Sequence, residues 1–132
     1  MKRFRCYLDT SVFNFVLADN IPDRQSFTLE YIKEVQAGKF ECFISALVID
    51  EINRASTNKR EKLSEVVNRI NPKTLNADES VVKLAEQYIK GGIIPIRYRD
   101  DSLHIATAVR NDMDMIISWN MEHMVKLKTR LG

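Results

Sequence analysis

The sequence is poor in cysteine, has no long apolar run and carries almost no excess of charge. Cys6 and Cys42 are its two cysteines and form no Cys-x-x-Cys pair, which excludes a thiolate zinc site and indicates small buried side chains in a reducing compartment. No apolar stretch approaches the ~18 residues of a membrane-spanning helix. The stretch behind the basic residues 1–3 stops at Asp9, too short for the core of a signal peptide. We therefore expect a cytoplasmic protein without a membrane partner.

What is present is the composition of one ordinary globular domain. The chain has 132 residues, of which 45% are hydrophobic and 29% are charged, enough for a real hydrophobic core. Its net charge of +2 does not by itself indicate nucleic-acid binding. There is no internal repeat, low-complexity tract or linker in the sequence. The expected organisation is a single domain over 1–132.

Short apolar segments alternate with helical patterns along the chain. Strands are expected over 4–9, 40–44 and 115–118, where short apolar runs lie between helix signals. The expected helices cover 11–18, from Asp23 or Ser26 to Gly38, from Ser45 to 52, 58–70, 77–90, 100–109 and a tail after residue 120. This alternation predicts an α/β layered fold with a mainly parallel sheet.

Particular residues set the expected helix ends and inner faces. Ser11 and Ser45 are the expected N-caps of the helices after the first two strands, and Gly38 is the expected C-terminal cap of the second helix. The inner face of that second helix is expected to consist of Phe27, Tyr31, Ile32 and Val35.

Four acidic or amide residues recur beside segments that are expected to be buried: Asp9, Glu51, Asp101 and Asn120. In open parallel sheets, ligands collect beyond the C-terminal strand ends, where Asp9 ends the first strand and Asn120 follows the last. Glu51 lies six residues beyond its strand, and a helix rises only ~1.5 Å per residue, so it stays near the same edge. Converging carboxylates need a positive partner, and a hard divalent cation such as Mg²⁺ or Mn²⁺ is the expected one. The pattern makes the chain a candidate metal-dependent nuclease.

Each of these residues also has a simpler explanation. Asp9 can satisfy backbone N–H groups at a strand-to-helix turn, and Asp101 or its neighbour Asp100 can cap a helix. Glu51 can lie on a solvated helix face, and Asn120 can cap the last helix. The separate residues leave these alternatives open.

Taken together, the segments resemble the PIN-domain family, especially VapC-like toxin ribonucleases, over essentially the whole chain. The resemblance rests on Leu8-Asp9-Thr10-Ser11, on Ser45 through Glu51-Ile52, on Asp101-Ser102-Leu103-His104-Ile105-Ala106-Thr107-Ala108, and on Ile116-Ile117-Ser118-Trp119-Asn120 with His123. It implies a three-layer α/β/α sandwich and an Mg²⁺- or Mn²⁺-dependent endoribonuclease that cleaves single-stranded RNA, with single-stranded or structured RNA as its partner. It also implies a toxin that pairs with a small antitoxin protein, and a homodimer.

The resemblance assigns roles to particular residues. Asp9, Glu51 and Asp101 look like the acidic metal-site residues, and Asn120 completes the catalytic set where many members have Asp. An amide supplies no negative charge, so a tightly held second ion is in doubt. Supporting hydroxyls are expected at Thr10, Ser11 and Ser118.

Basic residues near the acidic centre are candidates for binding the RNA backbone. Arg97 and Arg99, just before Asp101, are the expected phosphate contacts, while the basic stretch over 54–73 has a solvated helix face as its simpler explanation. His104 is expected to be structural or to support the site. Trp119 is expected in the core, although it has a face on which a base could stack.

Three other functions compete with this interpretation. Haloacid-dehalogenase-like phosphatases have a second Asp two positions after the first, where this chain has Ser11. A receiver-type phosphoacceptor needs an acidic pair and a Lys near the strand ends, which we do not find. The non-enzymatic alternative is a catalytically weakened PIN-like binding module acting through RNA or protein partners, and Asn120 is the residue that favours it.

Overall fold

A four-stranded parallel sheet forms the centre of the protein. The computed structural model describes residues 3–120, and the helix expected after residue 120, with His123, lies outside them. The strands stand in the order β3-β2-β1-β4 and cover Phe4–Leu8 (β1), Phe40–Ser45 (β2), Lys73–Leu75 (β3) and Met115–Ile117 (β4). Cys6 of β1 lies opposite Cys42 of β2 and Met115 of β4. The first strand in the sequence is therefore an inner strand of the sheet.

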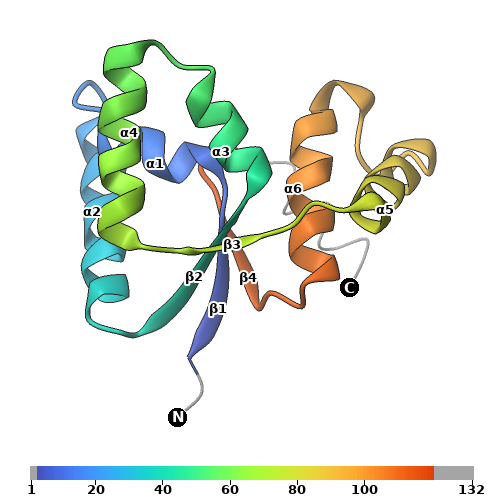
Figure 1. The fold of residues 1–132 in the computed structure, drawn as a ribbon, viewed down its shortest axis with the longest axis horizontal. Coiled ribbons are helices and arrows are strands. Elements are labelled where there is room, and N and C mark those ends of the chain that lie inside the picture. Colours follow the sequence, from blue (N-terminus) through green and yellow to red (C-terminus); the bar gives the residue numbers. More distant parts are fainter. Residues whose placement is uncertain (1–2, 121–132) are drawn as a thin grey trace.

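Helices cover both faces of the sheet. They are α1 (Thr10–Val16), α2 (Pro22–Gln36), α3 (Ala46–Asn53), α4 (Thr57–Ile70), α5 (Glu79–Lys90), α6 (Arg99–Arg110) and the short 3₁₀ helix η1 (Ile96–Tyr98). In Figure 1, α1, α2 and α4 lie on one side of the sheet, and α5 and α6 lie on the other. This arrangement is the expected three-layer α/β/α sandwich.

Each face of the sheet has its own hydrophobic core. The larger core joins β1 and β2 to helices α1 to α4 through side chains such as Leu8, Phe13 and Leu63. The smaller core lies between α5 and α6, around Val81 and Ile105, and it also receives Ile94. Ile116 of β4 packs against both cores. The inner strands β1 and β2 are therefore covered on both sides, as strands of parallel sheets generally are.

Most of the expected helix ends are found, with two corrections. Ser45 caps α3, because its hydroxyl accepts a hydrogen bond from Leu47 N at 3.2 Å. Gly38 follows α2 with φ of +83°, a conformation that glycine adopts without steric cost. The expected cap Ser11 was wrong: Asp9 caps α1, which begins at Thr10, since the Asp9 carboxylate accepts from Ser11 N. Neither Asp100 nor Asp101 caps α6, because both lie in its first turn and Tyr98 precedes the helix.

The inner face of α2 differs from the one expected at Phe27. Phe27 is 70% exposed and Thr28 is buried in its place, whereas Ile32 is buried and Val35 packs against the larger core as expected. Tyr31 still packs against the larger core. No helix within residues 3–120 is long and apolar enough to cross a bilayer.

Candidate active site at the carboxyl edge of the sheet

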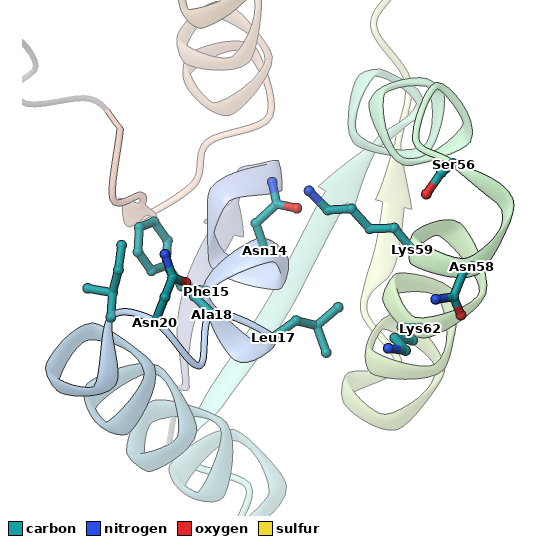
Figure 2. A pocket seen from close by; sticks show the side chains of 10 residues that line it. Asn14, Phe15, Leu17, Ala18, Asn20, Ser56, Asn58, Lys59 and Lys62 are labelled. Atoms are coloured by element: carbon teal, nitrogen blue, oxygen red, sulfur yellow. The ribbon is translucent and has the colours of Figure 1, made fainter.

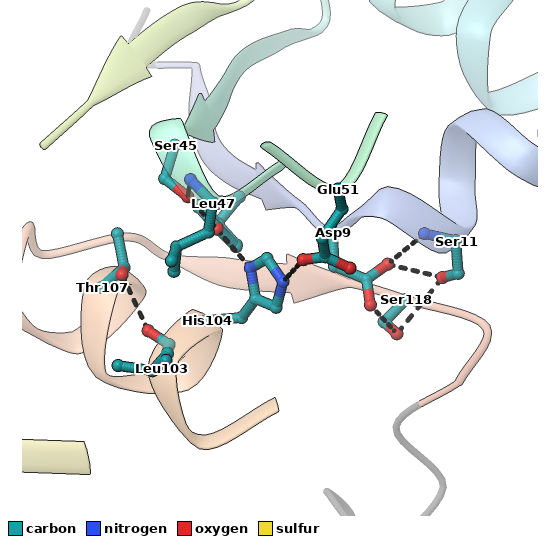
Figure 3. A network of polar contacts seen from close by, with 10 residues as sticks. Asp9, Ser11, Ser45, Leu47, Glu51, Leu103, His104, Thr107 and Ser118 are labelled. Carbon is teal, nitrogen blue, oxygen red and sulfur yellow. Dashed lines mark hydrogen bonds and ion pairs between the residues drawn. The ribbon is translucent and has the colours of Figure 1, made fainter. Parts of the chain in front are cut away.

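Asp9 is a buried carboxylate held by two hydroxyls. It follows β1 directly and is 4% exposed. Its Oδ1 accepts hydrogen bonds from Ser11 N at 3.0 Å and from the Ser11 hydroxyl, and its Oδ2 accepts from Ser118 Oγ at 2.8 Å. Figure 3 shows the two serines on the same side of this carboxylate. Both carboxylate oxygens are therefore oriented by side chains from separate parts of the chain.

The same two hydroxyls fix the segment after β4. Ser11 Oγ accepts from Trp119 N at 2.9 Å, and Ser118 Oγ accepts from Asn120 N at 3.1 Å. A serine hydroxyl has one proton to donate and two lone pairs that accept. Each hydroxyl donates its proton to Asp9, so its lone pairs are free to accept from the backbone N–H groups of Trp119 and Asn120. These bonds hold the segment after β4 next to the end of β1.

A second carboxylate, Glu51 of α3, lies at the end of a chain of polar side chains. Glu51 Oε1 is 2.6 Å from Nε2 of His104, and His104 Nδ1 is 2.6 Å from the Tyr7 hydroxyl. That hydroxyl is in turn 2.7 Å from Ser45 Oγ. Tyr7 and Ser45 have no exposed surface, and His104 is only 2% exposed. These polar side chains thus connect the carboxyl ends of β1 and β2 to α6 and end at the partly exposed Glu51 (Figure 3).

The surroundings of Glu51 favour its charged form. Burial raises the pKa of Glu51, but the hydrogen bond and charge of His104, together with Thr10 and Arg54, outweigh burial and lower it. Burial is also the main reason why the pKa of Tyr7 is raised, and the negative charges of Asp9 and Glu51 add to this effect. Asp9 and Glu51 therefore both lie near enough to the buried Tyr7 hydroxyl to raise its pKa.

Two protonation states of His104 are compatible with the hydrogen bonds among Ser45, Tyr7, His104 and Glu51. If His104 is neutral, Nε2–H donates to Glu51 and the Tyr7 hydroxyl donates to Nδ1. If His104 is doubly protonated, it donates to both neighbours and Tyr7 donates to Ser45. In either state His104 Nε2–H donates a hydrogen bond to Glu51, so the histidine holds this carboxylate in one orientation.

Thr10 contributes an oxygen with unused bonding capacity. It is 9% exposed, and its hydroxyl is the one buried side-chain polar atom without a hydrogen-bond partner in the part of the chain that the structure describes. The hydroxyl lies near enough to Glu51 to help lower that residue's pKa, although it forms no well-aligned hydrogen bond with it. An unpaired buried hydroxyl costs free energy, so a ligand at this position is chemically reasonable.

The other expected site residues lie in η1, in α6 and after β4. Asp101 is half-buried in the first turn of α6. Asn120 is exposed, and its backbone N–H makes the contact with Ser118. Arg99 forms an ion pair with Glu86 of α5, and the Arg97 guanidinium lies 4.9 Å from the centre of the Tyr98 ring.

Sequence reasoning missed a small polar cavity next to Glu51. Its volume is about 30 Å³, enough for a water molecule, and Asp50, Asp100, Arg54 and His104 are among its lining residues. The cavity receives the side of α6 that carries Asp100 and His104. The i, i+4 spacing of these two residues was a signal that would have placed Asp100 there.

The donors of this edge suit a divalent cation in kind. Asp9, Glu51 and the free Thr10 hydroxyl offer the oxygen atoms that Mg²⁺ and Mn²⁺ prefer. Within residues 3–120, however, no group of three or more His, Cys, Asp or Glu side chains is close enough to hold a metal ion. In the arrangement described, Asp9 is held by serines and Glu51 by His104.

Comparison with known proteins gives information on the fold. No protein-family profile and no curated protein matches the sequence. Among solved structures, the chain is similar to one in the VapBC2 complex from Rickettsia felis, which was crystallised bound to a DNA fragment from its own promoter. The TM-score is 0.65 and the identity 14%, over 93% of this chain and 92% of that chain. The likeness confirms the expected fold class, a PIN-like parallel sheet flanked by helices.

Proposed function

We propose that the protein is an Mg²⁺- or Mn²⁺-dependent endoribonuclease that cleaves single-stranded RNA and acts as the toxin of a toxin–antitoxin pair. The observation that carries this proposal is the buried Asp9 carboxylate, held by Ser11 and Ser118 where β1 and β4 end side by side. The likeness of the fold to a VapBC2 chain supports the class of function. A carboxylate that is costly to bury and is positioned by two hydroxyls is expected at a working site.

The chain's own residues have defined tasks in this proposal. Asp9, Glu51 and Asp101 would hold the cation, which when bound supplies a nucleophile from water and stabilises charge on the phosphoryl oxygens. Ser11 and Ser118 keep the Asp9 oxygens in one orientation, and His104 keeps Glu51 charged. Recruiting three carboxylates requires rotation of the side chains that now lie apart.

The remaining proposed contributions come from amide and basic groups. Asn120 would act at the exposed rim as a neutral ligand or as a holder of water. Arg97 and Arg99 would bind RNA phosphates, and Arg99 would exchange Glu86 for RNA. The small antitoxin and the second copy of a homodimer are proposed as protein partners on the basis of the resemblance.

Two measurements on the purified protein test the proposal. Mn²⁺ should raise the unfolding temperature of the metal-free protein and should be required for cleavage of generic single-stranded RNA. In Asp9→Asn both effects should be lost, whereas Glu65→Gln, which neutralises an exposed residue of α4, should retain both. An Asp9→Asn protein that cleaves at the wild-type rate would contradict the assignment, and so would cleavage that persists in a chelator.

A binding module without catalysis is the second candidate. Asn120 and the separation of the carboxylates favour it. It predicts that RNA binds whether or not Mn²⁺ is present and that no RNA is cleaved. Co-expression with the product of the neighbouring reading frame tests the toxin role, because a small antitoxin should co-purify with this chain.

A further inference from the structure

A second cavity lies beside α1, apart from the polar chain that ends at Glu51. Its volume is about 420 Å³, which is in the range of small-molecule sites. Phe15, Leu17 and Ile21 give it apolar walls at the end of α1 and in the following loop, and the first turns of α4 close it. Figure 2 shows Lys59 reaching from α4 across this space toward Asn14 of α1. The cavity therefore has a larger apolar part and a smaller polar part.

The polar part of the cavity favours an anion. Lys59 and Lys62 line it, whereas none of its described lining residues is acidic. Within residues 3–120 neither lysine forms an ion pair. The cavity also includes the start of α4, where the Ser56 side chain makes no capping hydrogen bond. Free backbone N–H groups at the start of a 14-residue helix add to the attraction for a negative group.

The apolar part of the cavity offers an aromatic face next to the proposed centre. Phe15 is half-buried, with its ring 5.6 Å from that of Trp119, and the Arg24 guanidinium lies over both rings at 5.5 and 5.3 Å. Trp119 N is bonded to Ser11 Oγ, which itself donates to Asp9. Trp119 thus links Phe15 in the cavity wall to Ser11, which holds Asp9. Along α1, Asn14 is five residues beyond Asp9, a rise of about 7.5 Å.

We propose that this cavity binds one nucleotide of a single-stranded RNA, with the base against Phe15 and a phosphate on Lys59 and Lys62. The inference rests on the proposed function for the class of ligand and adds a subsite to it. Aromatic faces for bases beside cations for phosphates are the combination by which proteins hold single strands. Asn14, Asn20 and Asn58 supply amide donors and acceptors around the base. A strand seated here runs along α1 toward Asp9.

The test measures binding without cleavage. A fluorescent 2′-O-methyl oligouridine is titrated with the full chain in EDTA at several salt concentrations, and its anisotropy gives the affinity. The double variant Lys59→Gln/Lys62→Gln should bind more weakly, with a slope of log affinity against log salt that is shallower by about 1.4, for two lost contacts at ~0.7 each. Phe15→Leu should weaken binding roughly fivefold or more without changing that slope. Uridine monophosphate should compete with the oligonucleotide in the wild type.

A matched control uses two lysines from the opposite side of the sheet. Lys83→Gln/Lys90→Gln on α5 removes the same charge away from the cavity and should leave both affinity and slope close to those of the wild type. Equal slopes for the two double variants would overturn the inference. It would also be overturned if polyglutamate displaced the oligonucleotide as well as the mononucleotide does, because the cavity would then recognise an acidic peptide. If the oligonucleotide binds as expected but Mn²⁺-dependent cleavage is absent, the proposed function is contradicted while the nucleotide subsite stands.

Discussion

Single hydrogen-bonding atoms carry much of the organisation at the carboxyl edge of the sheet. The Tyr7 hydroxyl joins Ser45 to His104 in a region without exposed surface, and His104 joins it to Glu51. Buried polar networks of this kind stabilise a fold when every member is paired. The orientation of Glu51 therefore depends on an atom of β1 that it does not touch.

Removing the Tyr7 hydroxyl should measure this dependence. Tyr7→Phe leaves His104 Nδ1 buried without its partner, so we expect the free energy of unfolding to fall by about 1–3 kcal/mol. Tyr31→Phe is the matched control, because the Tyr31 hydroxyl interacts with the sulfur atoms of Cys42, at 3.7 Å, and of Cys6, and sulfur is a weak acceptor. Urea unfolding of both variants gives the comparison, and an equal loss in the two would contradict the role of the chain.

Glu51 should make stability depend on pH in the acidic range. Although burial raises its pKa, the partners led by His104 lower it below the ordinary value, so the unfolded chain binds a proton at Glu51 more readily than the folded one. The contribution is complete above the ordinary Glu pKa and is lost as the pH falls through the folded pKa. Wild-type protein should therefore lose more stability than Glu51→Gln between roughly pH 5 and 3. Parallel curves from urea unfolding at each pH would reject this expectation, and Glu65→Gln serves as the exposed control.

Helix ends decide how the elements meet at that edge. Asp9 and Ser45 each end a strand and begin a helix, and both side chains accept a backbone N–H two residues on. The other end of α4 is set by Asn71, which has φ of 53° and ψ of 54°. Left-handed residues of this kind close a helix and redirect the chain, here into β3.

The end of α4 gives a prediction at the scale of one element. Asn71→Ala should destabilise the protein by about 1 kcal/mol, because a β-carbon without a polar group is strained in the left-handed region. Asn71→Gly should be close to the wild type, since glycine adopts this conformation freely. Thermal unfolding separates the two, and an alanine variant as stable as the glycine variant would show that the strain is absorbed elsewhere.

Local sequence patterns predicted the helices and strands better than they predicted the contacts between them. Periodicity and apolar runs gave helices and strands close to those observed, and the position of Asp9 and Glu51 followed from the strand ends. The strand Lys73–Leu75 was missed, because three residues with two polar side chains show no alternation. The pairing of Tyr7 with His104 joins residues 97 positions apart, and no local pattern specifies such a pair. Phe27 was misplaced, because a helix with few apolar residues defines its inner face weakly.

On the scale of the whole molecule, the sheet separates two cores of unequal size. β1 is paired on both sides and buried over Cys6–Leu8, whereas β3 is a short edge strand with two exposed residues. Cooperative opening should therefore begin at the β3 edge and reach β1 last.

Native-state hydrogen exchange tests this order. Amides of Cys6–Leu8 should exchange most slowly among the strands, with protection close to the global free energy of unfolding, and those of Lys73–Leu75 should exchange fastest. The two sets are compared in one sample by NMR. Equal protection of β1 and β3 would mean that the sheet opens as one unit.

The serine bonds to Asp9 have a consequence for the order in which the site is made during synthesis. Asp9 leaves the ribosome well before Ser118, its hydroxyl partner, which is 109 positions later in the sequence. Nascent chains that have already paired β1 with β2 still lack one of the two side chains that orient this carboxylate. The arrangement is completed only when translation has passed the end of β4, so unfinished chains do not present it to the cell.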